Sequence, residues 1–355
     1  MSEALVVAAS AVSAAGIGRP ALRSALRGTP ALLLPVESLK PTHGDVVGAQ
    51  VPPGMAEAEL SSRRLQGKLS RSALLAAVAI RRALAEAEWS EGREEIGYFL
   101  GVGASGCSIA EIEAMLGIAM KEQHLSLGLM GSQALAACNP LFAFQAMHNF
   151  TLCHGAIAEE LGGPNAAFYS RGAGTVGALE EAVSALEEQL CHRVLAGGAD
   201  TLLHPLTWAE LLTDGTAAPG FIPGEGAAIL ALSRTSSRSL AAIEKCGAYS
   251  GPSSLEQKLE QALADLSRRE IDCIAIAPSG EPPRQQLRSF AAAQFPGAAL
   301  LDVTAKLGEC VAASPALGWV AAIDALLELG AGRALALSAG LDAELGCVLF
   351  RRGEA

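Results

Sequence analysis

The fold of this chain is constrained most strongly by its apolar runs. Short segments rich in Ala, Val, Leu and Ile recur along the sequence, and most lack the alternating polar residues of a half-exposed strand. Such runs are typical of strands in a sheet that is covered on both faces. The predicted strands are residues 4–10, 96–102, 166–170, 193–199, 227–233, 241–249, 272–277, 299–303, 333–338 and 347–351.

Helical patterns fill the intervals between these strands. The predicted helices span residues 70–87, 108–120, 175–190, 255–268 and 319–329. The helix that begins near Thr175 has an apolar stripe opposite four glutamates, formed by Leu179, Val183, Leu186 and Leu190. Gly330 follows the last helix and is typical of a helix C-terminus. Strands that alternate with helices predict a layered α/β chain.

Composition excludes several classes of function. The formal net charge of −11 argues against binding to nucleic acid or to an anionic membrane surface. No apolar run approaches the ~20 residues of a membrane-spanning helix, so no membrane insertion is expected. The eight cysteines are scattered without a CxxC motif, which is typical of reduced thiols in a cytosolic protein. Because Glu3 lies in the N-terminal apolar run and no basic residue precedes Arg19, we expect no signal peptide and a cytoplasmic location.

Residues 162–179 read GGPNAAFYSRGAGTVGAL and carry the most informative motif. Gly-Pro-Asn opens a short strand, residues 171–174 make a tight turn, and a helix follows. A nucleophile in such a turn would lie at a helix N-terminus, where the positive end of the helix dipole lowers the pKa of a thiol. The turn of this chain carries Gly172 and no sulfur.

This stretch resembles the active-site region of the β-ketoacyl synthases of the thiolase superfamily, in which the turn presents an acyl-accepting cysteine. Laid on that pattern, Gly172 falls at the cysteine position. AGGAD at residues 196–200, GFIPGEGAA at 220–228 and Lys306 then follow in the family's order. The resemblance covers essentially the whole chain.

The resemblance implies a thiolase-like α/β fold. Such a fold has two halves related by a pseudo-twofold axis, in α-β-α-β-α layers. A polar stretch at residues 234–239 separates the two halves. We therefore expect an N-terminal half at residues 1–238 and a C-terminal half at residues 239–355.

The chain departs from the family at every catalytic position. The family's first histidine follows a strand, but here Ala277 ends that strand and PSGEPP follows. No histidine occurs after His204, and Glu309 lies nearest the position of the second family histidine. The family's late Gly-Phe-Gly-Gly loop is reduced to GLDA at residues 340–343. The degenerate positions are Gly172, Ala277 and Glu309, so no catalytic residue, cofactor or metal is expected.

These losses bear on the family's reaction. Claisen condensation needs a thiolate that can be acylated and hydrogen-bond donors that stabilise the charge formed on decarboxylation. A glutamate at a donor position would repel that charge. The resemblance therefore implies a chain length factor, the inactive homologue that pairs with an active ketosynthase in type II polyketide systems and limits chain length. The short chain and Gly172 favour the systems that make polyenes, such as aryl polyenes, over the aromatic ones.

The same resemblance predicts two surfaces. The strand before the turn should pair with its counterpart in a ketosynthase partner, through Ala167, Phe168, Tyr169, Ser170 and Arg171. The predicted helix at 108–120 and the following segment should border the acyl tunnel, through Ile109, Ile112, Met115, Leu116 and Met130. Plain core packing is an equally open interpretation of each tunnel residue. The negative charge indicates that the partner would supply the basic dock for an acidic acyl carrier protein.

Other interpretations stay open at this point. An autonomous enzyme with altered chemistry, such as thioester hydrolysis or malonyl decarboxylation, would need Glu309 or Cys310. Arg171 could pair with Glu309 or Glu225 in the emptied site, or be solvated or bonded to backbone. GVGASG at residues 101–106 matches a dinucleotide-binding pattern, but a glycine-rich turn under the sheet explains it too. Two Cys-His pairs, at 153–154 and 191–192, lack the spacing of a metal site.

Overall fold

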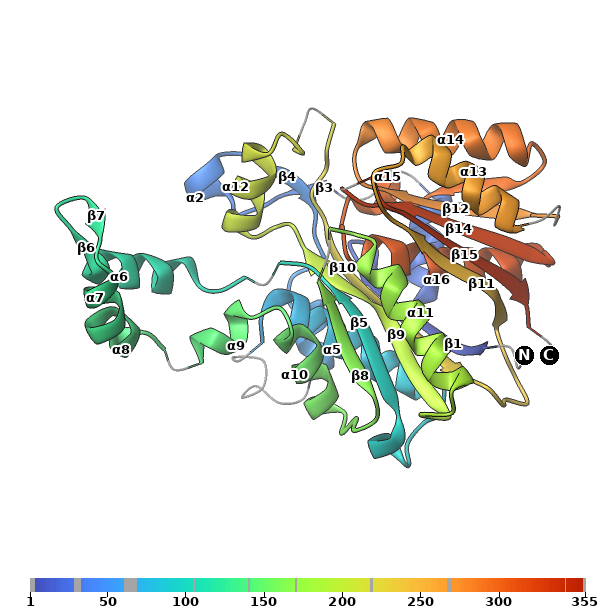
Figure 1. Cartoon of the computed structure of the whole chain (residues 1–355), viewed down its shortest axis with the longest axis horizontal. Coiled ribbons are helices and arrows are strands. Elements are labelled where there is room, and N and C mark those ends of the chain that lie inside the picture. The colour runs from blue at the N-terminus through green and yellow to red at the C-terminus, as the bar shows by residue number, and fades with distance from the viewer. Residues whose placement is uncertain are drawn as a thin grey trace.

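The computed structural model describes residues 4–28, 33–60, 69–104, 106–139, 141–169, 171–217, 220–266, 270–341 and 343–353. Its centre is one large mixed sheet flanked by helices (Figure 1). The predicted strands and helices are confirmed within the described residues, with ends that shift by a few positions. The largest shift is at α16 (Ser314–Leu329), which begins five residues before the prediction with a proline in its first turn. Gly330 ends that helix in the left-handed conformation, with φ of 65°, as expected.

The strand order shows an internal repeat that the sequence does not. One set of five comprises β8 (Asn165–Tyr169), β5 (Gly97–Val102), β9 (Arg193–Thr201), β10 (Glu225–Ser233) and β1 (Ala4–Ser13). The other set comprises β13 (Ala299–Asp302), β12 (Cys273–Pro278), β14 (Arg333–Ala339), β15 (Leu345–Arg352) and β11 (Ala241–Tyr249). The sets join where β1 pairs with β11.

The two sets have the same topology. In each, the strand second from the edge pairs in parallel with both neighbours, and the remaining pairs are antiparallel. Chain order within each set is also the same. The fold is therefore the expected thiolase-like arrangement of two related halves. The division at residue 238 falls between β10 and β11, and we keep it as a proposed boundary.

Helices complete five layers around these strands. α11 (Gly174–Glu187) and α16 share one apolar core with strands of both sets, so they form the middle layer. α5 (Arg71–Glu86) packs with the outer face of the first set, beside α10 (Phe150–Ala158). α13 (Leu255–Leu266) and α14 (Glu281–Gln294) cover the outer face of the second set (Figure 1). Residues 314–326 of α16 are all buried, as expected of a helix that lies between the two sets of strands.

The connection from β5 to β8 breaks the repeat. In the second half the corresponding connection, from β12 to β13, holds α14 alone. In the first half it holds an arm, residues 106–146, which precedes α10 and stretches away from the body (Figure 1). The arm contains α6 (Ile109–Ala119), a hairpin of β6 (Met120–Lys121) and β7 (His124–Leu125), α7 (Leu127–Leu129), the π-helical turn η2 (Met130–Ala134), α8 (Leu135–Ala137) and α9 (Phe142–Ala146).

Short elements complete the described chain. They are α1 (Arg19–Arg27), β2 (Gly16–Ile17), β3 (Leu33–Pro35), α2 (Lys40–His43), β4 (Val47–Ala49), α3 (Met55–Glu59), η1 (Arg93–Glu95), α12 (Pro205–Thr213) and α15 (Thr304–Leu307). Among the described helices, none combines the length and the apolar character that crossing a bilayer would require.

Candidate functional site

The turn between β8 and α11 is closed by backbone contact. Gly172 has φ of +133°, a conformation that side-chain-bearing residues rarely adopt. A Cβ built on Gly172 would lie 2.7 Å from the Cα of Gly340. The backbone N–H of Leu341 also donates to the carbonyl of Arg171 at 2.9 Å. The position that the resemblance assigns to a nucleophile thus accepts glycine alone, because another part of the backbone presses on it.

Little space remains beside this turn. The hollow there has a volume of about 30 Å³ and is lined by Tyr169, Arg171, Asp200 and Leu341, with Gly103, Ala104, Leu202, Thr207, Glu210, Leu211 and Val311. A cavity of this size holds no more than a few water molecules. It has no room for an acyl chain.

The suggested pairing of Arg171 with Glu309 or Glu225 is wrong. Arg171 donates to the carboxylate of Asp214, in the loop after α12. Each glutamate has its own arginine: Glu225 pairs with Arg71 at 2.7 Å, and Glu309 pairs with an arginine of α14. Both glutamates are buried and already paired, whereas Asp214 lies at the surface.

The carboxylate of Glu309 holds its own loop, the loop after β12 and α14 together. Its Oε2 accepts from the backbone N–H of Gly280 at 2.7 Å, and its Oε1 accepts from Nη2 of Arg284 at 3.2 Å. Arg284 also pairs with Asp302 at 2.7 Å. Burial raises the pKa of Glu309 from 4.5 to about 7, against the opposing effect of these donors. Glu309 therefore serves to hold the loop after β12, where the family would place a histidine.

The other suggested reactive group is buried. Cys310 is fully enclosed, and burial raises the pKa of its thiol well above the ordinary value. The nearby carboxylates of Asp200, Glu225 and Glu309 add to this effect. A thiol without access or a tendency to ionise is a poor nucleophile, so the interpretation of Cys310 as a relocated nucleophile loses its support.

The third degenerate position, Ala277, lies in β12 with its side chain buried.

The glycines of GVGASG serve close packing. A Cβ at Gly101 would lie 1.9 Å from Oγ1 of Thr175, and one at Gly103 would lie 1.8 Å from Oδ1 of Asp200. A Cβ at Gly106 would lie 2.4 Å from Cδ2 of His204. Each glycine lets a side chain from another segment touch the backbone, so the pattern has a structural explanation. The dinucleotide interpretation gains no support.

Asp200 and His204 are the residues that the motif analysis passed over. Asp200 is buried, and its carboxylate accepts from the backbone N–H groups of Thr201 at 2.8 Å and of Ala312 at 3.1 Å. Burial raises the pKa of Asp200 to about 7. The AGGAD motif contains this aspartate, but a polar residue at a strand end has many possible partners, and only the fold identifies Ala312.

The predicted interface residues lie on the free edge of the sheet. β8 is the last strand of the first set, so one of its edges pairs with no other strand among the described residues. Ala167 and Phe168 pack partly inward against the apolar cores. Tyr169 is 56% exposed and stacks on His148, with ring centroids 4.0 Å apart. Ser170 lies outside the described residues.

The predicted tunnel residues all lie on the arm. Ile109, Ile112, Met115 and Leu116 belong to α6, and Met130 begins the π-helical turn. Met115 and Met130 meet in a small cluster whose buried members are Met115, Ala119 and Ala134. Leu116 is 39% exposed. The structure thus places Met115 and Met130 in one cluster, exposes Leu116 and leaves Ile109 and Ile112 half-buried.

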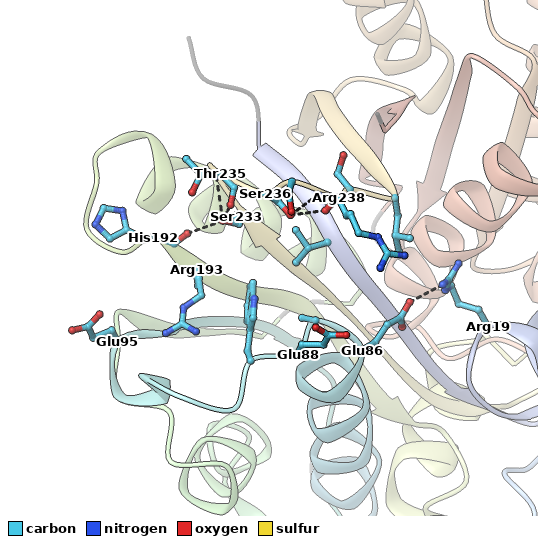
Figure 2. A pocket seen from close by; sticks show the side chains of 16 residues that line it. Arg19, Glu86, Glu88, Glu95, His192, Arg193, Ser233, Thr235, Ser236 and Arg238 are labelled. Carbon is cyan, nitrogen blue, oxygen red and sulfur yellow. Dashed lines mark hydrogen bonds and ion pairs between the residues drawn. The ribbon is translucent and has the colours of Figure 1, made fainter. Parts of the chain in front are cut away.

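A wide groove lies at the opposite ends of the strands. Its volume is about 840 Å³, and it runs between the end of α5 and the loop after β10 (Figure 2). Trp89 and Arg193 form part of one wall, with the guanidinium 5.5 Å from the indole centroid. Arginines and glutamates both line the groove, so its charge favours neither anionic nor cationic ligands. Of the residues considered above as metal ligands or catalytic groups, His192 alone lines it.

Metal chemistry finds no support in this region. Within the ranges that the structure describes, no group of three His, Cys, Asp or Glu side chains is arranged to hold a metal ion. The Cys-His pairs of the sequence stay isolated from one another.

Comparisons with known proteins agree on the fold. The family model "Beta-ketoacyl synthase, N-terminal domain" matches residues 55–238. The solved structure of "the ishigamide ketosynthase/chain length factor" is similar over 99% of both chains, with 20% identity and a TM-score of 0.78. A β-ketoacyl synthase from Burkholderia phymatum STM815 has 16% identity and a TM-score of 0.80, over 99% of this chain and 100% of its own.

A third solved structure holds a type II PKS acyl-carrier protein in complex with its ketosynthase, AntDE:AntF. It has 14% identity to this chain and a TM-score of 0.77, and it covers 99% of this chain and 100% of its own. No curated protein matches the chain.

Restoring a thiol at the turn should not restore a working site. We expect Gly172→Cys to lower the free energy of unfolding by about 1–3 kcal/mol, because a side chain there has both an unfavourable φ and a clash with Gly340. Gly172→Ala is the matched control without sulfur and should lose the same amount in chemical denaturation. A Gly172→Cys protein with wild-type stability that is acylated by an acyl thioester in mass spectrometry would contradict the sealed geometry.

The buried carboxylate of Glu309 predicts a pH dependence of stability. Because the folded-state pKa lies above the unfolded value of 4.5, this group favours folding most below pH 4.5, and its contribution falls as pH rises to about 7. The loss should reach at most about 3 kcal/mol. In Glu309→Gln this part of the slope should vanish, which urea titrations from pH 4.5 to 7.5 would measure. Glu281→Gln, which removes an exposed partner of Arg284, should leave the slope unchanged; equal slopes in wild type and Glu309→Gln would refute the assignment.

Proposed function

The chain belongs to the β-ketoacyl synthase family, and on that premise we propose that it is a chain length factor. In this role it is a non-catalytic subunit that forms a heterodimer with an active ketosynthase and shapes the acyl tunnel. The acyl carrier protein would then be engaged through the complex. We retain the narrower hypothesis of a polyene-forming system, such as that of the aryl polyenes, from the sequence alone.

One observation carries the non-catalytic part of this proposal. The whole family fold is present, yet the position of the nucleophile is a glycine pressed against Gly340. A chain that had merely lost a side chain would keep an open cavity, whereas this one has a hollow of about 30 Å³. The alternative of an autonomous hydrolase or decarboxylase needs an accessible nucleophile or base. Glu309 and Cys310, the candidates for it, are both buried.

The free edge of β8 supports a partner at this side of the molecule. An unpaired edge strand invites pairing with another chain unless it is covered or charged. Large apolar side chains are exposed on β8 and on the segment that precedes it in the chain, which includes α10, namely Met147, Ile157 and Tyr169. Aromatic and methionine side chains are enriched in protein interfaces. A strand from the partner would cover both the edge and these side chains.

The arm supports the same conclusion from a second surface. Its buried cluster is small, and a core of this size is too weak to hold such a segment in water unaided. The arm also exposes large aliphatic side chains, namely Leu116, Met120, Leu125, Leu127 and Leu135. Contiguous exposed apolar surface typically marks a binding site. With methionines among its contacts, the arm would form an adaptable apolar wall for a growing chain.

The heterodimer is tested by co-expression with the ketosynthase encoded beside this chain. We expect a one-to-one complex in native mass spectrometry, and chain elongation only when both proteins are present. Tyr169→Asp should abolish the complex, because it places a charge in the interface. Leu329→Asp, a residue of equal 56% exposure at the end of α16, should leave it intact. A homodimer that turns over an acyl thioester unaided would refute the proposal.

Tunnel shaping is tested by changing the size of side chains on α6. Ile112→Ala and Leu116→Ala should lengthen the products of the reconstituted pair by at least one extension unit, because they remove apolar volume from the wall. Ile112→Phe should shorten them. Leu212→Ala, an exposed position on α12, is the control for a surface truncation away from the arm. Mass spectra that show the same product lengths for all four variants would reject a tunnel role for this helix.

A further inference from the structure

The direction of the arm depends on how its root is held. The arm leaves the sheet after β5 through residues 103–108, and α6 begins only at Ile109. The side chain of Ser108 caps α6 by accepting from the N–H of Glu111, a bond within the arm itself. Contacts that tie the root to the body must therefore come from other segments. Two such contacts come from the five residues that end β9 and precede α12.

His204 makes the more direct contact. One ring nitrogen, Nε2, lies 2.8 Å from the carbonyl oxygen of Cys107, in the root of the arm. The other, Nδ1, accepts from the backbone N–H of Leu206 at 3.3 Å and so caps the N-terminus of α12. Because Nδ1 accepts, the proton must be on Nε2, which donates to Cys107. A single neutral imidazole thus joins α12 to the arm.

Gly106 and Gly103 fit this attachment. A Cβ at Gly106 would lie 2.4 Å from the ring of His204, so the arm can approach the ring only with glycine there. A Cβ at Gly103 would overlap the carboxylate of Asp200, the second point at which the root rests on the body. Asp200 is itself fixed by the backbone N–H groups of Thr201 and Ala312. The root is therefore held by one segment, residues 199–204, which also accepts the backbone N–H of Gly103 at the carbonyl of Ala199, at 3.3 Å.

We propose that His204 is the positioning residue of the arm, and that its bond to Cys107 sets where α6 lies relative to the body. The proposal deepens the proposed function and rests on it in one respect: α6 carries the side chains that would line the tunnel. A shift at the root would displace α6, because α6 begins at Ile109, two residues after Cys107. His204 would in this way influence product length without touching the acyl chain.

Substitutions can separate the two roles of the imidazole. His204→Ala removes both the cap of α12 and the bond to the arm. His204→Asn keeps a good N-cap acceptor but is too short to reach Cys107. Gly106→Ala leaves His204 in place and pushes the root off the ring. The last two variants keep the test valid if His204→Ala fails to fold.

The first measurement is hydrogen exchange followed by mass spectrometry on the chain alone. In His204→Asn and Gly106→Ala we expect exchange across the arm to rise about five- to tenfold, the factor for one lost hydrogen bond. Peptides from β9, β10 and α16 should exchange as in wild type, and α12 should stay protected in His204→Asn. A uniform rise throughout the chain would mean a merely structural histidine and overturn the proposal. Wild-type exchange in the arm of both variants would overturn it as well.

The second measurement uses the complex with the ketosynthase. We expect His204→Asn to form the heterodimer and to give a broader range of product lengths. An unchanged range, with a loosened arm, would overturn the link from His204 to chain length. If the wild-type chain supports elongation with no ketosynthase, the proposed function fails instead, and the exchange experiment still decides whether His204 holds the arm.

Discussion

The backbone of Ala312 is the junction on which the site of this protein depends. Its N–H donates to the buried carboxylate of Asp200, at the end of β9, and its carbonyl accepts from Oγ1 of Thr175, in the first turn of α11. Asp200 and Thr175 belong to the first half of the chain, and Ala312 leads into α16 of the second. The two halves are thus bonded where each contributes a helix to the middle layer. A buried carboxylate is costly to desolvate, and the raised pKa of Asp200 reflects that cost.

Buried carboxylates hold separate segments of the chain together throughout this region. Asp200 holds Ala312, Glu225 binds Arg71 and the N–H of Val51, and Glu309 holds the loop at Gly280. Each is almost fully buried and accepts from backbone N–H groups or from an arginine. Hydrogen bonds to charged groups contribute more than neutral ones, and they leave a large penalty when broken. These carboxylates therefore hold the backbone together around the turn at Gly172.

The strands could be predicted from the sequence because a strand that is buried on both faces is a continuous run of apolar residues. It could not specify partners that are far apart in the chain. Arg171 and Asp214 are separated by 43 positions, and nothing in the sequence near Arg171 distinguishes Asp214 from Glu309 or Glu225. The start of α16 was missed for a related reason, since Ser314 and Pro315 are typical of a helix start only once the preceding loop is known. The arm's departure from the body was also hidden, because an apolar helix has the same pattern whether it faces its own core or another protein.

If the chain is a chain length factor, the close contact between Gly172 and Gly340 in the turn after β8 has a physical explanation. β8, which offers the free edge, runs directly into the turn at Gly172, so the interface and the former nucleophile position belong to one segment. An empty cavity at that point would loosen the edge strand, because lost side-chain volume costs packing energy in its surroundings. The contact of Gly172 with Gly340, together with the bond from Leu341 to Arg171, replaces the missing side chain by backbone. On this argument, closing the site is what keeps the edge in shape for a partner, and reopening it would weaken the heterodimer before it restored any chemistry.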